Sequence, residues 1–179
     1  MKEPQDSFVI HIGKLWNGPE GGIAEEDFER ELTFNPKQIV TKSAIVGHIL
    51  LVKSKGEITA VLSEIETVVE LECERCLTKY EYEIDIESCE RTFYSKKPED
   101  DPDFDGIFLI NLKDLTIDLY DMIRQEIILH FPLISVCSKG CKGLCAQCGI
   151  NKNKKKCKCK EPKTAEENKP FKDLKKLIQ

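Results

Sequence analysis

The chain has 179 residues, of which 40% are hydrophobic, and its formal net charge is −5. A chain of this length buries one sizeable core, so we expect one main domain with an appended module. No stretch approaches the ~20 apolar residues of a transmembrane helix, and residues 1–7 are polar with mixed charge. We therefore expect a cytosolic protein.

The basic residues are concentrated near the C-terminus. Residues 137–160 contain eight lysines and no acidic residue, which leaves 19 basic against 32 acidic residues in the rest of the chain. The net charge of −5 argues against general nucleic-acid binding, whereas the basic C-terminal end of the chain is suited to an anionic partner. The lysines predicted to contact this partner are Lys139, Lys142, Lys152, Lys154, Lys155, Lys156, Lys158 and Lys160.

The N-terminal third of the chain is rich in β-forming residues. Residues 7–12 predict a short strand that ends at Gly13, and residues 17–22, which are rich in glycine, predict a loop. Residues 45–52 are apolar on both faces, which is typical of a strand that is covered on each side.

Two longer segments alternate apolar and acidic residues. This period of two, in residues 57–72 and 80–87, predicts two antiparallel strands of a sheet with one buried face. Cys73 and Cys76 lie between the two segments. We therefore expect this cysteine pair at the tip of a long hairpin.

Residues 95–106 are acidic and contain two prolines, which predicts a solvated loop, and residues 106–110 predict one more short strand. Asp118 then begins a predicted helix, which Pro132 ends. We expect this helix to close the open face of the sheet and to lead the chain to the cysteine-rich segment. Its apolar face comprises Leu119, Met122, Ile123 and Ile127, widened near its end by Ile128 and Leu129.

Two further residues lie near the predicted core. Glu126 is next to the apolar stripe of the helix, and we expect it at the flank of a wide helix face rather than buried. Cys89 has no cysteine at metal-binding spacing, so we expect a small buried hydrophobic residue there.

Six of the nine cysteines lie within residues 137–159. Cys145 and Cys148 are separated by two residues and followed by Gly149, a spacing that lets one tight turn hold two thiolates on a tetrahedral ion. Cys157 and Cys159 offer a second pair, so four sulfurs can surround one zinc ion at about 2.3 Å. Buried or disulfide-bonded cysteines are the alternative, but this lysine-rich context is too polar for core packing, and a reducing compartment disfavours disulfides.

The remaining cysteines predict a second zinc site. Cys137 and Cys141 cannot both join a site that already has four ligands, and Cys73 and Cys76 form the only other Cys-x-x-Cys pair in the chain. Spacing alone does not show that these two pairs meet. A zinc ion held by four thiolates is formally −2, so part of the nearby lysine charge offsets it, and the lysines could also be only a solubilising face.

These patterns predict an α+β fold with a mainly antiparallel β-sheet, one packing helix and a C-terminal cysteine-rich zinc-knuckle module. We expect the sheet domain in residues 1–135 and the knuckle in residues 136–160. Residues 161–179 should form a linker and a short amphipathic tail, which folds when it docks on the body or on a partner.

Three motifs occur together in this chain: Cys73-x-x-Cys76 at a predicted turn, residues 126–133 with the sequence Glu-Ile-Ile-Leu-His-Phe-Pro-Leu, and residues 141–149 (Cys-Lys-Gly-Leu-Cys-Ala-Gln-Cys-Gly) followed by Cys157-Lys158-Cys159. In this combination the chain resembles the YceD family, the large ribosomal RNA subunit accumulation proteins. The resemblance covers most of the chain, and its C-terminal cysteine cluster is specific.

The resemblance implies a bacterial cytosolic protein that supports the production, processing or stability of 23S ribosomal RNA, with no known enzymatic activity. The residues agree with a non-enzymatic protein, because none of the three histidines lies in the cysteine cluster and no metal site with an open position is evident. A lysine cluster stiffened by zinc favours contact with RNA phosphates. We expect ribosomal RNA or a pre-ribosomal particle as partner, with no membrane and no small-molecule substrate.

Two other functions fit the same sequence. The protein could be a scaffold that binds a ribosome-assembly protein through its acidic sheet face or its C-terminal segment. Alternatively, it could be a redox-regulated chaperone, in which oxidation of the paired cysteines releases zinc and unfolds the module.

Overall fold

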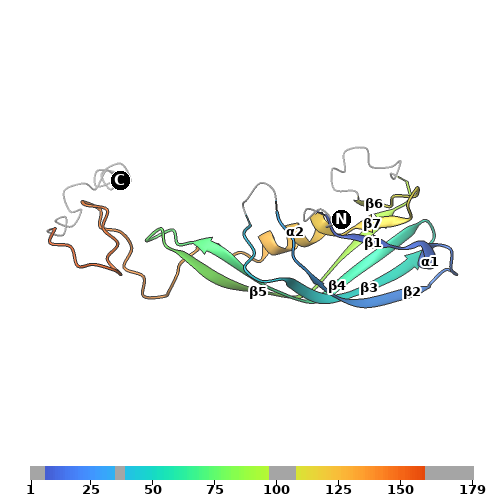
Figure 1. Cartoon of the computed structure of the whole chain (residues 1–179), viewed down its shortest axis with the longest axis horizontal. Helices are drawn as coiled ribbons and strands as arrows, with labels where there is room; N and C mark the ends of the chain where they lie inside the picture. The colour runs from blue at the N-terminus through green and yellow to red at the C-terminus, as the bar shows by residue number, and fades with distance from the viewer. Residues whose placement is uncertain (1–6, 35–38, 97–107, 160–179) are drawn as a thin grey trace, which may run out of the picture.

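The computed structural model describes residues 7–34, 39–96 and 108–159. In it, a five-stranded and a two-stranded sheet form a body, from which one long hairpin extends toward the C-terminal segment (Figure 1). The elements are β1 (Val9–His11), α1 (Gly13–Trp16), β2 (Ile23–Arg30), β3 (Ile45–Ser54), β4 (Glu57–Glu72), β5 (Lys79–Tyr94), β6 (Phe108–Leu109), β7 (Thr116–Asp118) and α2 (Tyr120–Leu129).

The larger sheet is a meander with one parallel strand at its edge. β2, β3, β4 and β5 follow one another in antiparallel pairs, whereas β6 pairs with β5 in parallel. β1 and β7 form a separate antiparallel pair. The predicted sheet is therefore confirmed as mostly antiparallel, but the single predicted helix is accompanied by a second, four-residue helix, α1. Neither helix in the described part of the chain is long and apolar enough to span a bilayer.

The hairpin of β4 and β5 pairs without a break in register from Glu57 and Tyr94 to Glu72 and Lys79. Its alternation is as predicted, but the buried face changes phase at Glu64. Even-numbered residues of β4 are buried before this position and odd-numbered residues after it. Glu64 has a φ of 53°, and the pairing of β4 with β3 shifts by one residue beside it, which is a β-bulge. Because of this bulge, β4 buries even-numbered residues in its first half and odd-numbered residues in its second half, which leads to the cysteines at the hairpin tip.

α2 provides much of the apolar cover of the sheet. Leu119, Met122, Ile123 and Ile127 have no exposed surface, so the predicted apolar face is confirmed. The predicted widening is wrong, because Ile128 is 37% and Leu129 is 70% exposed. Both lie in the last turn of α2, and from there the chain runs toward the hairpin tip (Figure 1).

The prediction for Glu126 is also wrong, since this residue is only 7% exposed. Arg91 of β5 reaches its carboxylate, with 2.7 Å between Arg91 Nη2 and Glu126 Oε1, and so joins strand and helix. Cys89 is half-buried against the core, close to its expected role. Burial, followed by the nearby Glu126 carboxylate, raises the pKa of Cys89 to about 12.

Two strands differ from the expectation. The sequence did not predict β2, because Phe28 is its only buried residue and the strand therefore lacks alternating apolar residues. β3 is a strand as predicted, but it is well covered on one face only: Ile45, Ile49 and Leu51 are buried, whereas Val46 is 36% exposed.

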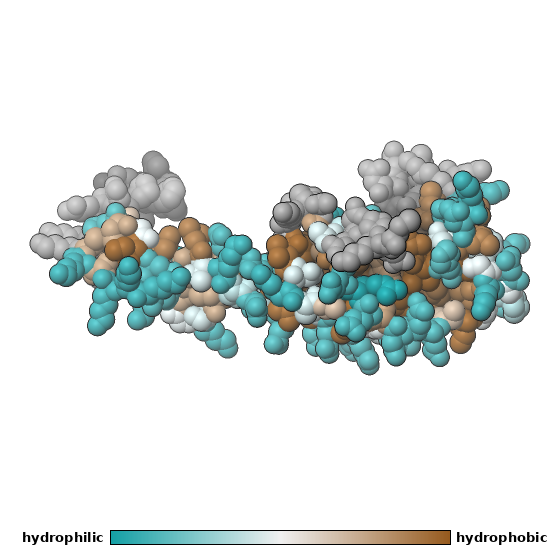
Figure 2. Space-filling view, viewed as in Figure 1, coloured by the Kyte–Doolittle hydropathy of each residue, from teal (hydrophilic) through white to brown (hydrophobic). Residues whose placement is uncertain are grey.

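Several predicted segments fall outside the described residues. These are most of the acidic loop, the C-terminal linker with its amphipathic tail, and Lys160. The proposed boundaries at residues 135 and 160 stay predictions. On the visible face, apolar residues gather in the body, and hydrophilic residues spread over the hairpin and the C-terminal end (Figure 2).

Candidate metal centres

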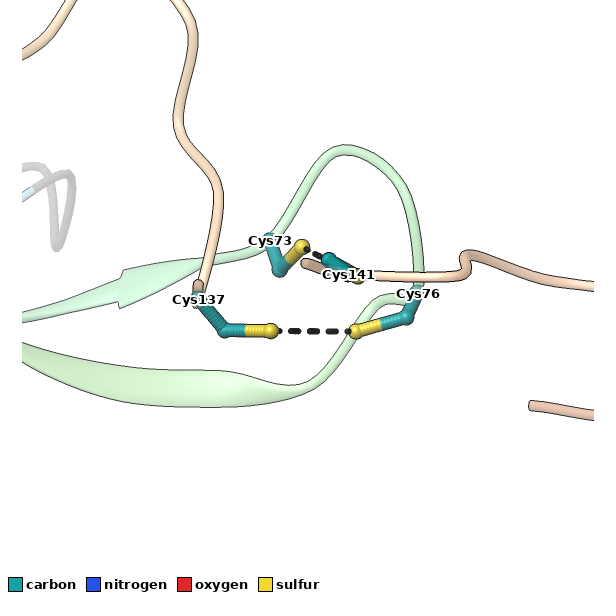
Figure 3. A group of neighbouring side chains, drawn as sticks. All are labelled: Cys73, Cys76, Cys137 and Cys141. Carbon is teal, nitrogen blue, oxygen red and sulfur yellow. Dashed lines mark hydrogen bonds between the residues drawn. The ribbon is translucent and has the colours of Figure 1, made fainter. Parts of the chain in front are cut away.

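The hairpin tip and the segment after α2 meet at four cysteines, which we name cluster 1: Cys73, Cys76, Cys137 and Cys141. Their sulfur atoms all lie within 4.8 Å of one another. Figure 3 shows Cys73 and Cys76 entering from the turn between β4 and β5, and Cys137 and Cys141 from the opposing chain. The structure thus brings together the two pairs that spacing alone could not join.

The sulfur spacing of cluster 1 fits a tetrahedral zinc ion. The Sγ atoms of Cys73 and Cys141 are 3.8 Å apart, and those of Cys76 and Cys137 are 3.6 Å apart. Four sulfurs at about 2.3 Å from one central ion lie about 3.8 Å from each other. A disulfide would require about 2.05 Å, so these cysteines stand as separate thiols at metal-binding distance.

The cysteine turn in cluster 1 has a defined backbone geometry. The amide of Leu77 donates to the carbonyl of Cys73 at 2.8 Å, and the amide of Cys73 donates to the carbonyl of Thr78 at 3.0 Å. Leu77 follows the second cysteine and has a φ of 55°, which is the left-handed region. This turn points both sulfurs of a Cys-x-x-Cys pair to one side.

The same turn occurs again in cluster 2, which consists of Cys145, Cys148, Cys157 and Cys159. Here the amide of Gly149 donates to the carbonyl of Cys145 at 2.8 Å, the amide of Cys145 donates to the carbonyl of Ile150 at 2.8 Å, and Gly149 has a φ of 69°. The four sulfurs again lie within 4.8 Å of one another. Two matching turns, 72 positions apart in sequence, therefore each hold one pair of thiols next to a second pair, so that four sulfurs come together in each cluster.

Hydrogen bonds from two asparagines connect the two clusters. Asn151 Nδ2 donates to the carbonyl of Cys76 and to Thr78 Oγ1, both at 3.1 Å. Asn153 Nδ2 donates to the sulfur of Cys141 at 3.3 Å, and its Oδ1 accepts from the amide of Lys142 at 2.9 Å. Sequence reasoning gave these residues no role. The signal was two polar, uncharged residues within an otherwise lysine-rich stretch.

Ser135 fixes the chain just before cluster 1. Its hydroxyl donates to the carbonyl of Glu72 at 3.0 Å and lies 2.8 Å from the Tyr80 hydroxyl, while its own carbonyl accepts from the amide of Glu74 at 2.8 Å. The chain leaving α2 is therefore fastened to both strands of the hairpin, and Cys137 follows two residues later.

The thiols of each cluster influence one another. In cluster 1, hydrogen bonding from Thr78 lowers the pKa of Cys76 to about 6. The hydrogen bond between Cys137 and Cys76 raises the pKa of Cys137 to about 12. In cluster 2, backbone hydrogen bonding at Cys148 lowers the pKa of Cys145 to about 6, and a hydrogen bond with Cys148 raises the pKa of Cys159 to about 12. In each cluster one thiol pKa is thus lowered and another raised, and a divalent cation would stabilise the thiolate forms.

The predicted RNA-contacting lysines lie around these clusters. All seven that the structure describes are exposed, and none forms an ion pair with another described residue. They are Lys139, Lys142, Lys152, Lys154, Lys155, Lys156 and Lys158.

Gly143 lies against the backbone of the hairpin tip at Arg75. It has a φ of 68°, a β-carbon placed on it would lie 3.0 Å from the carbonyl oxygen of Arg75, and this same oxygen accepts from the amide of Leu144 at 2.9 Å. Gly149 has a similar φ, but no atom of a described residue lies within 4 Å of such a β-carbon. Substitutions at these two glycines therefore distinguish the cost of a left-handed backbone, which both share, from the cost of the contact with Arg75, which only Gly143 makes.

We expect Gly143→Ala to destabilise the cysteine-rich segment more than Gly149→Ala. The left-handed backbone costs about 1 kcal/mol in both variants, and the contact with Arg75 brings the cost for Gly143→Ala to about 2 kcal/mol. The measurement is the rate at which a chelator removes zinc from each protein. Equal rates would show that the Arg75 contact does not hold the two turns together.

Comparison with known proteins agrees with the motifs. The family model described as "Large ribosomal RNA subunit accumulation protein YceD" matches residues 61–178. The chain belongs to the YceD family. The match begins within β4, and the matched residues include the hairpin tip, α2 and both cysteine clusters of this chain.

Two plant proteins are similar over shorter stretches. "Large ribosomal RNA subunit accumulation protein YCED homolog 1, chloroplastic" of Arabidopsis thaliana is 42% identical over 43 residues, or 24% of this chain and 13% of the relative. The protein of the same name from Zea mays is 37% identical over 77 residues, or 42% of this chain and 26% of the relative. The matched stretches thus span about a quarter or less of these relatives. No solved structure matches the chain.

Proposed function

We propose that this YceD family member is a non-enzymatic zinc-binding protein that supports the accumulation of large-subunit ribosomal RNA by contacting RNA through its lysine-rich, cysteine-held segment. The observation that carries the proposal is the placement of seven exposed lysines, without described ion-pair partners, around two four-cysteine clusters. The bacterial cytosol is the compartment we propose, although the relatives named above are chloroplastic.

The donor set supports zinc as the ion in both clusters. Four cysteine sulfurs within 4.8 Å of one another suit Zn²⁺, and soft thiolates disfavour Mg²⁺ and Ca²⁺. Because protein sulfurs fill all four positions, neither site leaves a coordination position for water or substrate. This closed arrangement supports a structural role for both ions and a protein without metal-based catalysis.

Charge supports RNA as the partner. Residues 137–159 contain lysines and no acidic side chain, so this end attracts phosphates while the acidic body repels them. Attraction of this kind is insensitive to base sequence and weakens steeply with salt. The segment has no aromatic residue on which bases could stack, which favours recognition of the RNA backbone over readout of single-stranded bases.

The test is ultraviolet crosslinking in cells, followed by sequencing of the attached RNA. We expect 23S precursor RNA to be enriched with the wild-type protein and to fall at least several-fold with a variant in which Lys152, Lys154, Lys155 and Lys156 are changed to Gln. Zinc content should be equal in both proteins, which shows that the lysine changes leave the cysteine clusters intact.

Two outcomes would overturn the proposal. If a zinc-loaded wild-type protein recovers no ribosomal RNA, the segment is not an RNA-contacting surface. If the lysine variant still supports normal 23S accumulation and crosslinks equally well, the lysines are dispensable, and a scaffold that binds an assembly protein becomes the better explanation.

A further inference from the structure

Four of the seven described lysines line one hollow beside cluster 2. The hollow has a volume of about 450 Å³, and Lys142, Lys152, Lys155 and Lys156 contribute to its wall. Lys139, Lys154 and Lys158 do not line it. The structure thus divides the lysines into two groups that their sequence positions do not distinguish, since Lys154 lies directly before Lys155.

Backbone hydrogen bonds hold three of the hollow's lysines in place. The amide of Lys142 donates to Asn153 Oδ1 at 2.9 Å, the amide of Lys152 to the carbonyl of Gly143 at 3.0 Å, and the amide of Lys155 to the carbonyl of Asn151 at 3.0 Å. The wall therefore has a fixed frame that is continuous with the asparagine link between the clusters. Binding an anion there would cost less ordering entropy than gathering free lysines.

The charge within the hollow remains positive after the cysteines are counted. Cys145, Cys157 and Cys159 line the same hollow, and a zinc ion with four thiolates is formally −2. Four lysines outweigh this charge. Cluster 1 differs, because Glu72 and Glu74 flank its first cysteine and reduce the positive charge there.

We propose that this hollow is the site at which the protein holds phosphodiester groups of an RNA backbone, and that the lysines outside it contribute little. This inference rests on the proposed RNA contact and narrows it to one surface. The lysines at the wall would bind the phosphate oxygens, which stay clear of the negatively charged sulfurs. Recognition would then depend on the shape of the backbone at this position.

The test compares two triple variants that each remove three charges. The hollow variant, Lys152→Gln/Lys155→Gln/Lys156→Gln, removes three of the four lysine charges that line the hollow. The control variant, Lys139→Gln/Lys154→Gln/Lys158→Gln, removes three lysine charges outside it. A fluorescently labelled RNA hairpin is titrated with the zinc-loaded full chain, and anisotropy is recorded at several salt concentrations. Zinc content and circular dichroism confirm that both variants are folded.

We expect the hollow variant to bind at least about ten-fold more weakly and to lose about 2 from the salt slope, since each phosphate contact contributes about 0.7 to 0.9 to it. The control variant should stay within about three-fold of wild type, with a slope change below about 1. Inorganic phosphate should displace the RNA only at concentrations far above that of the RNA.

Three results would overturn the inference. Equal weakening by the two triple variants, or greater weakening by the control, would indicate a diffuse basic surface while leaving RNA binding itself intact. Displacement of RNA by inorganic phosphate at near-stoichiometric amounts would indicate a site for small anions. If the wild-type protein binds no RNA even at low salt, the proposed function fails together with the hollow.

Discussion

The zinc-loaded protein should contain two zinc ions per chain, and Cys76→Ser and Cys148→Ser should each lower this number to one. The reason is that each variant removes one of four ligands from a different cluster and leaves a three-sulfur site, which holds zinc poorly. The measurement is metal content by atomic emission after gel filtration. Cys89→Ser is the matched control, because Cys89 belongs to neither cluster, and this variant should keep both ions.

Removal of both ions should unfold the cysteine-rich segment without unfolding the body. The buried residues of cluster 1 form their own small group, separate from the hydrophobic core of the body, so the body retains its packing when the ions leave. We expect a strong chelator to make residues 136–159 sensitive to protease, while the thermal unfolding of the body changes by only a few degrees. The segment lacks an apolar core of its own, as small metal-dependent modules do.

Two results would contradict this account. Loss of both ions from Cys76→Ser would mean that the clusters fold as one unit through Asn151 and Asn153. A zinc content of one in the wild-type protein would mean that only one cluster binds metal. Acidification should release zinc from both sites, because protons compete with the ion for thiolates, and lysine variants should not change this pH dependence.

Local sequence patterns predicted the cysteine turns and the hairpin well. Alternation in residues 57–72 and 80–87 fixed two strands with Cys73 and Cys76 between them, because a period of two places alternate residues on opposite faces. The spacing of Cys145 and Cys148, followed by Gly149, predicted a tight turn that the backbone confirms. The meeting of Cys73 and Cys76 with Cys137 and Cys141 was inferred only by counting ligands, since no local pattern encodes a contact across more than 60 positions.

The features that sequence reasoning missed depend on tertiary partners. Leu77 occupies the left-handed position that Gly149 occupies in the second turn, and nothing about a leucine signals this conformation. The roles of the two asparagines depend on their partners in the folded chain: Asn151 bonds Cys76 and Thr78 at the hairpin tip, and Asn153 bonds Cys141 and Lys142. Glu126 was misplaced for the same reason: a helix pattern shows which side is apolar, but it does not show that Arg91 from β5 will meet an acid there.

Arg91→Met should destabilise the folded protein by about 2 kcal/mol. The change leaves Glu126, whose side chain is only 10% exposed, without its cation, and breaking a buried pair in this way costs about 3–5 kcal/mol when both partners are fully buried. We expect the lower value because the Arg91 side chain is 34% exposed, so solvent partly screens the pair. The measurement is urea unfolding of the zinc-loaded full chain, followed by tryptophan fluorescence and circular dichroism.

The double variant Arg91→Met/Glu126→Leu should recover most of this loss. Replacing both partners with apolar side chains of similar size removes the uncompensated charge and lets α2 pack on β5 through apolar contact. Lys79→Met is the control, since Lys79 approaches Glu70 at 2.6 Å but is 67% exposed, and such a surface pair contributes little. If the double variant is no more stable than Arg91→Met, the ion pair supplies a favourable interaction that apolar packing does not replace. The contact between helix and hairpin would then depend on charge, and the position of cluster 1 relative to the body would depend on it as well.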